Sequence, residues 1–378
     1  MAASRQRVLS RVALFALLAL CALTACSLIT SYDGLEGPPK GGDAAPPPVE
    51  ASAPDVVSPP PPPDPCTSEG VPAPPDAGGS TTDLGSLVGA VKTVRLLDGD
   101  AGDAFGLNLD HTCGASCASS AAKPPQDPSS GIDNSVFDLF QTLKAAGLNL
   151  NDRGFNDALA GGQWGLVFRL QQYSGAADDD DVQLELFNAA AVNSQDGGPG
   201  TARFDNTDQW VIDSRSAVAG ASLFRSKVAY VRNNTLVARF ERFPPTLRTS
   251  GGPGIVLLLE PEIFSVVVTA KIVSHDNGLL TLTEGTIAGA VTAEEFLLQI
   301  QRLGTCKDQP IFPVVTDYVC GARDLAATTS APATDKCTRV SIAIGFEATP
   351  AHLSPNLKVV TDTRGCDGGD PTQGCGSR

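Results

Sequence analysis

The stretch IFSVVVTAKIVSHDNGLLTLTEG, residues 263–285, decides the fold. Apolar side chains recur at every second position of its first half and define one face: Phe264, Val266, Val268, Ala270 and Ile272. The turn residues His275-Asp276-Asn277-Gly278 follow, and a second β-rich run comes after them. The stretch therefore predicts a β-hairpin that buries one face of its first strand.

Other parts of the chain repeat this pattern. The stretch KVAYVRNNTLVARFE (227–241) predicts a second hairpin, because Asn233 and Asn234 tolerate positive φ between two β-rich runs. Further strands are predicted over residues 163–173, 182–187 and 339–348. Alternation of apolar and polar residues indicates a sheet with one face in water, and such sheets pair antiparallel.

Three helices interrupt the strands. Residues 133–146 carry apolar side chains at i, i+3, i+4 and i+7, and a shorter segment covers residues 151–160. Thr292 and Glu295 form a capping box at the start of a third helix. Together these elements predict a mainly β fold, either a β-sandwich or an open antiparallel barrel, with about three flanking helices.

The N-terminus carries an export signal. Three arginines precede an apolar run over residues 12–23, and about 1.5 Å of rise per residue takes that run only half-way across a ~30 Å hydrocarbon core. Leu-Thr-Ala-Cys at residues 23–26 resembles a bacterial lipobox, which implies cleavage before Cys26 and diacylglycerol and acyl chains on that cysteine. Ser27, rather than aspartate, favours the outer membrane. The alternative is an ordinary secretory signal that is cut elsewhere.

The composition then divides the chain into three parts. Residues 1–25 form the signal peptide, and residues 26–82 form a lipid-anchored linker that is expected to be disordered. Fifteen prolines lie between residues 38 and 75, which favours extended polyproline II segments. Residues 83–378 have the composition of a globular domain.

The net charge excludes one class of partner. The whole chain carries −15, and loss of the three signal-peptide arginines leaves 24 basic against 42 acidic side chains, or −18. A surface this acidic repels phosphate backbones, so no nucleic-acid partner is expected.

The cysteines predict disulfides. Once Cys26 carries lipid and Cys21 is removed with the signal, eight remain: Cys66, Cys113, Cys117, Cys306, Cys320, Cys337, Cys366 and Cys375. An even number in an exported chain is typical of disulfide pairing. The short spacings predict two local loops, Cys113–Cys117 and Cys366–Cys375. The other four cysteines would pair in one of three ways.

No catalytic motif is present in the sequence. It lacks HExxH, GxSxG, a Walker loop and a GxGxxG between a strand and a helix. Of three scattered histidines, His275 is expected at a hairpin tip, and only His111, next to Asp110 and two residues before Cys113, has neighbours of chemical interest. The chain is therefore not expected to be an enzyme or to need a cofactor.

One acidic stretch (97–110) does resemble a calcium loop, because it gathers oxygen ligands: Asp98, Asp100, Asp103, Asn108 and Asp110. Asp133 could add to them, or could cap the following helix. A second acidic run at residues 177–182 is expected to be a solvated loop.

Several short motifs together carry a family resemblance. They are CSLITSYDGLEG (26–37), GLNLD (106–110), SSGIDN (129–134), GQWGLVFRL (162–170), LTEGTIAGAVTAEEFL (282–297) and CTRVSIAIGFEA (337–348). The chain resembles a group of Gram-negative outer-membrane lipoproteins of no established activity, which implies a membrane-anchored envelope protein and supplies no catalytic residues. We expect a surface-tethered binding or structural module that meets an envelope protein or a glycan on either face of the outer membrane. The alternative is an extracytoplasmic hydrolase, directed at glycans or esters, with an acidic site.

Overall fold

The computed structural model describes the folded part of the chain. The described residues are 66, 68–76, 83–96, 105–114, 117–118, 130–145, 151–193, 200–252, 255–275, 278–327, 335–360, 366 and 375. The chain divides into two units, Met1–Pro60 and Pro61–Arg378, and every described residue belongs to the second. The lipidation candidate Cys26 lies outside the described residues.

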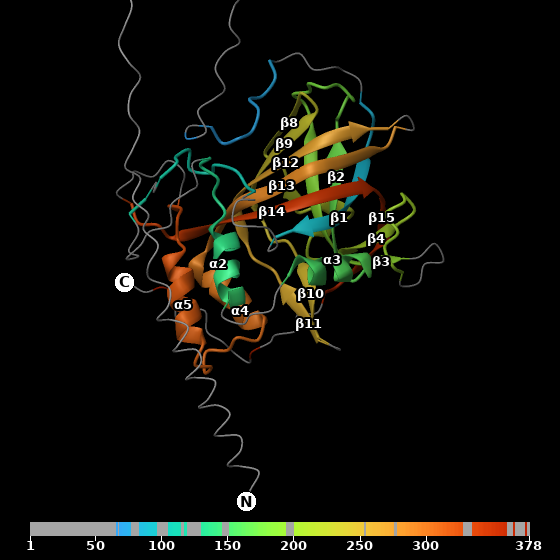
Figure 1. Cartoon of the computed structure of the whole chain (residues 1–378). Helices are drawn as coiled ribbons and strands as arrows, with labels where there is room; N and C mark the ends of the chain where they lie inside the picture. Colours follow the sequence, from blue (N-terminus) through green and yellow to red (C-terminus); the bar gives the residue numbers. More distant parts are fainter. Residues whose placement is uncertain are drawn as a thin grey trace, which may run out of the picture. The chain divides into compact units, whose positions relative to one another are not determined.

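The fold is mainly β, as the sequence predicts, and it is built on one large sheet (Figure 1). Neighbouring strands follow the order β15-β4-β3-β2-β1-β14-β13-β12-β9-β8, and β7 pairs with β3 off this path. The strands of this sheet are β1 (Leu87–Arg95), β2 (Gly165–Gln171), β3 (Gln183–Asn193), β4 (Gln209–Asp213), β7 (Phe224–Arg225), β8 (Val228–Arg232), β9 (Thr235–Phe243), β12 (Ile263–Ser274), β13 (Leu280–Thr292), β14 (Arg339–Pro350) and β15 (His352–Lys358).

Pairing in the sheet is antiparallel with one exception among the described strands. The edge strand β15 runs parallel to β4, so the sheet is mixed rather than purely antiparallel. Two further pairs lie outside it: β5 (Ala217–Val218) with β6 (Ala221–Ser222), and β10 (Leu247–Gly252) with β11 (Ile255–Leu259). An isolated antiparallel bridge joins Asp179, just before β3, to Val231 in β8. The sheet therefore curls until β3 approaches β8.

Both predicted hairpins are confirmed. β8 and β9 turn at Asn233 and Asn234, whose φ values of 50° and 59° are those the sequence required. β12 and β13 turn where expected, with the N–H of Gly278 donating to the carbonyl of His275 at 2.9 Å.

One residue of the first strand was placed wrongly. Val266, Val268, Ala270 and Ile272 are buried on one face as predicted, but Phe264 is only partly buried. The cause is an irregularity in the pairing with β13, where Ser265 adopts a φ of 51°. The alternation shifts by one residue across it, so Ile263 takes the fully buried position instead.

The second face of the sheet is also covered over part of its area, which the expectation of one wet face missed. The larger apolar cluster includes Val268, Ile287 and Ile344. A smaller one contains Val267, Ala288 and Ala343 from the opposite side of the same strands, under Phe105, Leu107 and Leu109. The loops that cover this second face carry the candidate site.

Four helices are present in the described part of the chain, one more than predicted. They are α2 (Ser135–Ala145), α3 (Asp152–Ala160), α4 (Ala293–Arg302) and α5 (Phe312–Gly321). The hydroxyl of Thr292 accepts from the N–H of Glu295, which confirms the N-terminal cap of α4. α2, α4 and α5 gather together in Figure 1, and the rings of Phe140 and Phe296 meet edge to face at 5.6 Å. No helix in the described ranges is long and apolar enough to cross a bilayer.

The prediction of disulfides is confirmed, but the predicted local loops are wrong. The four bonds are Cys66–Cys113, Cys117–Cys337, Cys306–Cys366 and Cys320–Cys375. Cys117 pairs at a distance because Ala118 forms a parallel bridge with Lys336, which brings Cys117 beside Cys337. Cys366 and Cys375 do not pair with each other: Cys366 bonds to Cys306, before α5, and Cys375 bonds to Cys320, near the end of α5.

Candidate functional site

Of the five residues proposed as calcium ligands, the structure describes only Asn108 and Asp110, so the calcium site stays a prediction. Asp98, Asp100 and Asp103 lie outside the described residues. The oxygens of Asn108 and Asp110 accept the backbone N–H of Thr112 at 3.1 and 2.9 Å, so both side chains shape a turn. No three histidine, cysteine, aspartate or glutamate side chains in the described ranges lie close enough to hold a metal ion.

Two other acidic residues hold loops in place. The buried carboxylate of Asp133 accepts the N–H of Leu109 at 2.5 Å, which ties the segment before α2 to the covering loop. Asp179, in the second acidic run, is buried rather than solvated, and it accepts the N–H of Ser174 at 2.7 Å. The sequence suggested a wholly solvated loop, but Asp179 is buried and bridges to Val231 of β8, while its neighbours Asp178 and Asp180 are exposed.

The described residues form a cavity of about 280 Å³ on the second face of the sheet. We call it the Arg339 pocket. Its floor is the smaller apolar cluster, with Val267 of β12 and Ala290 of β13. Its walls come from three loops and two strand arginines: Glu69, Leu109, His111, Leu325, Ala326, Arg239 and Arg339.

Small residues make room for the pocket. Gly289 and Ala290 of β13 face the irregularity of β12, and Ser265 lies at the pocket where the strand bends. A Cβ at Gly289 would come within 2.6 Å of Ile263 and 2.7 Å of the Phe264 carbonyl, so β12 and β13 approach as closely as they do only because this residue is glycine.

The two arginines of the pocket differ in their partners. Arg239 makes a two-pronged ion pair with Glu69, with Nη1 to Oε1 at 2.8 Å and a second contact between Nη2 and Oε2. Hydrogen bonding to Glu69 raises the pKa of Arg239. Arg339 lies 5.0 Å from the ring centroid of Phe264 and forms no ion pair with any residue that the structure describes.

Glu69 reaches the pocket from the proline-rich segment. The hydroxyl of Tyr230 donates to the carbonyl of Pro72 at 2.6 Å, Val71 packs on the smaller apolar cluster, and Cys66 is bonded to Cys113. The end of the predicted linker thus packs on the sheet, so the folded part begins before residue 83. Composition concealed this, because isolated anchors such as Glu69 and Val71 lie among prolines.

The histidine that the sequence singled out lines the same pocket. His111 and Asp110 stand at its rim with Ser265. His111 is exposed, with a φ of 59°, and its ring makes no hydrogen bond within the described part of the chain. The pocket thus contains a hydroxyl, an imidazole and a carboxylate, but they do not form a connected relay.

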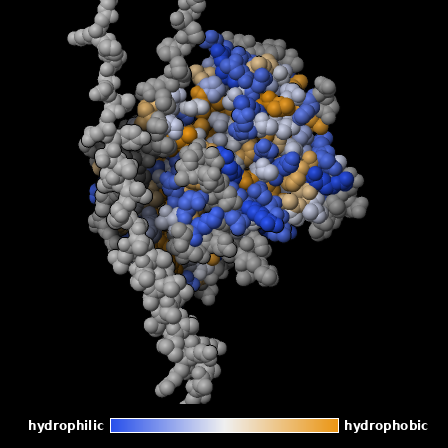
Figure 2. Space-filling view, in the orientation of Figure 1, coloured by the Kyte–Doolittle hydropathy of each residue, from blue (hydrophilic) through white to orange (hydrophobic). Residues whose placement is uncertain are grey.

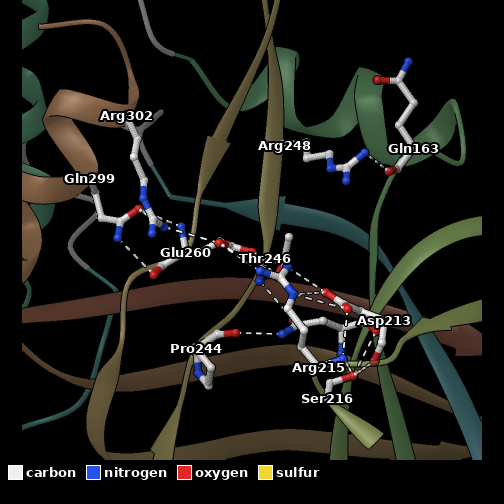
Figure 3. A network of polar contacts seen from close by, with 11 residues as sticks. Gln163, Asp213, Arg215, Ser216, Pro244, Thr246, Arg248, Glu260, Gln299 and Arg302 are labelled. Carbon is white, nitrogen blue, oxygen red and sulfur yellow. Dashed lines mark hydrogen bonds and ion pairs between the residues drawn. The ribbon is translucent and has the colours of Figure 1, made fainter. Parts of the chain in front are cut away.

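A separate polar network joins the β10–β11 ribbon to α4 and β4 (Figure 3). Glu260 contacts Arg215 at 2.5 Å and Arg302 at 3.3 Å, and Arg215 also pairs with buried Asp213. Gln299 of α4 accepts the Glu260 N–H at 2.8 Å and donates to its carbonyl at 3.0 Å. Burial lowers the pKa of Arg248, whose guanidinium donates to the Gln163 carbonyl. These groups satisfy one another, so the network locks elements together.

The Arg339 pocket is therefore the candidate site. It combines an apolar floor, an arginine without an acidic partner and a rim of polar groups, the usual features of a small-molecule site. No protein-family model matches the sequence, and neither curated proteins nor solved structures give a significant match.

Proposed function

We propose that the protein is a lipid-anchored binding module of the outer membrane that takes a small ligand in the Arg339 pocket. One observation carries this proposal: the Arg339 guanidinium lines a cavity with an apolar floor and has no carboxylate partner among the described residues. A charge beside apolar surface without a partner is costly unless it meets water or a ligand. Anchoring at Cys26 is the second half of the proposal and rests on the lipobox resemblance.

We infer that the scaffold is an open barrel. The strands from β3 round to β8 form a continuous path, and the bridge between Asp179 and Val231 links its two ends. Such closure supports a rigid wall on which loops can place ligand-binding groups.

The face of the molecule shown in Figure 2 favours a ligand bound in a pocket over a partner that docks on a broad apolar surface. On the face shown in Figure 2, apolar side chains lie in small groups between hydrophilic ones. An envelope protein or a glycan, the partners expected from the sequence, would have to meet the protein through surfaces outside the pocket.

Native mass spectrometry of the protein purified from membranes tests the binding function. We expect a co-purifying small molecule in the wild type and its loss in Ala326→Trp, which fills the pocket from its partly exposed rim. Val218→Trp, at a position that is 61% exposed and is not part of the pocket lining, is the matched control. A ligand that stays bound in Ala326→Trp would place binding elsewhere.

A hydrolase is the second candidate, favoured by the presence of Ser265, His111 and Asp110 in one pocket. It ranks lower because His111 makes no hydrogen bond to Ser265 in the described structure. Hydrolysis of p-nitrophenyl butyrate that disappears in both Ser265→Ala and His111→Asn would establish it. Equal rates in the wild type and both variants would exclude this site as the catalyst.

A further inference from the structure

We infer that the ligand of the Arg339 pocket is a small monocarboxylate with an apolar body. This inference rests on the proposed binding function and specifies its ligand class. It follows from the two arginines, the charge of the lining and the size of the cavity.

The first argument is that the pocket already contains a carboxylate bound to an arginine. Glu69, in the segment that precedes β1, places both oxygens on the guanidinium of Arg239. The side chain of Glu69 is only 11% exposed, whereas that of Arg239 is 40% exposed, so the carboxylate is the more shielded half of the pair. A planar guanidinium offers paired N–H groups that match the two oxygens of a carboxylate. The pair of Glu69 and Arg239 therefore shows that an arginine in this cavity can bind a carboxylate.

The second argument is that Arg339 has the same chemistry without the acid. Its described partner is the ring of Phe264, over which the guanidinium carbon lies at 5.0 Å from the centroid. A cation–π contact does not occupy the guanidinium N–H groups with an acceptor oxygen, so they remain available as donors to a carboxylate. A ligand carboxylate at Arg339 would repeat the arrangement that Glu69 makes at Arg239.

The third argument concerns charge and excludes polyanions. The pocket lining contains two arginines and two carboxylates, Glu69 and Asp110, so its formal charge is zero apart from His111. One carboxylate on a ligand can pair with Arg339, but a second negative charge would meet Glu69 or Asp110 without a cation to balance it. Like-charge contacts of this kind disfavour phosphate esters and dicarboxylates.

The fourth argument concerns the body of the ligand. Val267, Ala290 and Leu325 present buried apolar surface to the cavity, which favours an alkyl or aromatic group. A volume of about 280 Å³ lies just below the range of roughly 300–1,000 Å³ that is typical of pockets for drug-sized ligands. The cavity therefore fits a short acid rather than a whole lipid or an oligosaccharide.

Calorimetric titration of the full-length protein in detergent with hexanoate, hexanamide and hexyl phosphate tests this class. We expect hexanoate to bind at least tenfold more tightly than the other two. Arg339→Gln should weaken hexanoate at least tenfold, and Arg339→Lys, which keeps the charge but not the fork, should weaken it less. Arg242→Gln is the matched control, because Arg242 lies on the same strand as Arg239 and pairs with Glu262 rather than lining the pocket. Thermal unfolding of each variant verifies that it is folded.

The possible outcomes separate the two levels of the proposal. Hexanamide that binds as tightly as hexanoate, with no effect of Arg339→Gln, would overturn the carboxylate class. If that binding is lost in Ala326→Trp, the binding function stands. Failure of all three probes, together with no co-purifying molecule sensitive to Ala326→Trp, would overturn both. Glu69→Gln adds an independent test: it frees Arg239, so hexyl phosphate should bind at least tenfold more tightly than it does to the wild type.

Discussion

The carboxylate of Asp324 accepts the backbone N–H of Ser341 at 2.8 Å, one residue before Leu325 enters the wall of the Arg339 pocket. The same carboxylate accepts the hydroxyls of Ser341 and Ser135. It thereby joins β14, the start of α2 and the pocket loop at one buried point. Burial raises the pKa of Asp324 from 3.8 to about 6, because the charged form is removed from water and the three hydrogen bonds compensate only in part.

This raised pKa predicts a pH-dependent stability. The folded state holds a proton on Asp324 more tightly than the unfolded state does. The contribution of this side chain to the free energy of unfolding is therefore complete below pH 4 and is lost as the pH rises through about 6. Relative to Asp324→Asn, the wild type should lose on the order of 2–3 kcal/mol of unfolding free energy between those limits. Urea unfolding of both proteins at pH 4, 5, 6 and 7.5 measures the difference. A difference that stays constant over this range would contradict the assignment.

Glu260 is expected to stabilise the attachment of the β10–β11 ribbon. Its side chain is only 10% exposed and it neutralises Arg215 and Arg302, so Glu260→Gln leaves two partly buried cations without this acid. We expect the free energy of unfolding to fall by roughly 2–4 kcal/mol, less than for a fully buried pair because Arg215 retains Asp213.

Glu262→Gln is the control for this experiment. Glu262 lies two residues away and pairs with Arg242 at 2.7 Å, but both side chains are well exposed. Exposed pairs contribute about 0–1 kcal/mol, so its loss should change the urea midpoint little. Equal effects of the two substitutions would show that the Glu260 network adds nothing beyond a surface ion pair.

The disulfide pattern predicts which bond matters most for the fold. Cys117–Cys337 closes a separation of 220 residues and both cysteines are buried, whereas Cys66–Cys113 closes only 47 residues. Replacing both Cys117 and Cys337 with serine should cost roughly 2–5 kcal/mol of stability. The pairing itself is checked by non-reducing peptide mapping, in which a peptide containing a Cys113–Cys117 loop would refute the structure.

The sequence predicted those features that depend on neighbouring residues. Asn233 and Asn234 specify a hairpin by their own φ preference, and Thr292 caps α4 through a contact three residues away. The fourth helix, α5, was missed because it lacks a side-chain cap and because exposed apolar residues, Val314 and Tyr318, obscure the buried stripe of Phe312, Val315 and Val319.

The candidate site could not be predicted because its parts are distant in the chain. Glu69, His111, Arg239 and Arg339 meet only after the sheet curls and three loops cover its second face. The prediction of the disulfide partners was wrong for the same reason. The short spacing between Cys113 and Cys117 carries no information about which distant segment lies beside each of them. The shift at Ser265 was equally hidden, because a period of two gives no sign of one extra residue.

The last prediction concerns the anchor at Cys26. The apolar run before it is too short to span a bilayer, so stable membrane attachment after cleavage requires the lipid. Each buried CH₂ contributes about 0.8 kcal/mol, which makes two or more acyl chains an effectively permanent anchor. Cys26→Ser should therefore move the protein from the membrane pellet to the soluble fraction and abolish labelling by an alkyne fatty acid.

Cys21→Ser is the matched control. Cys21 lies five residues earlier, within the apolar run, and its substitution should leave labelling and fractionation unchanged. Labelling that persists in Cys26→Ser would show that the lipid is carried elsewhere and would remove the anchor from the proposed function, while leaving the Arg339 pocket to be judged on its own ligand.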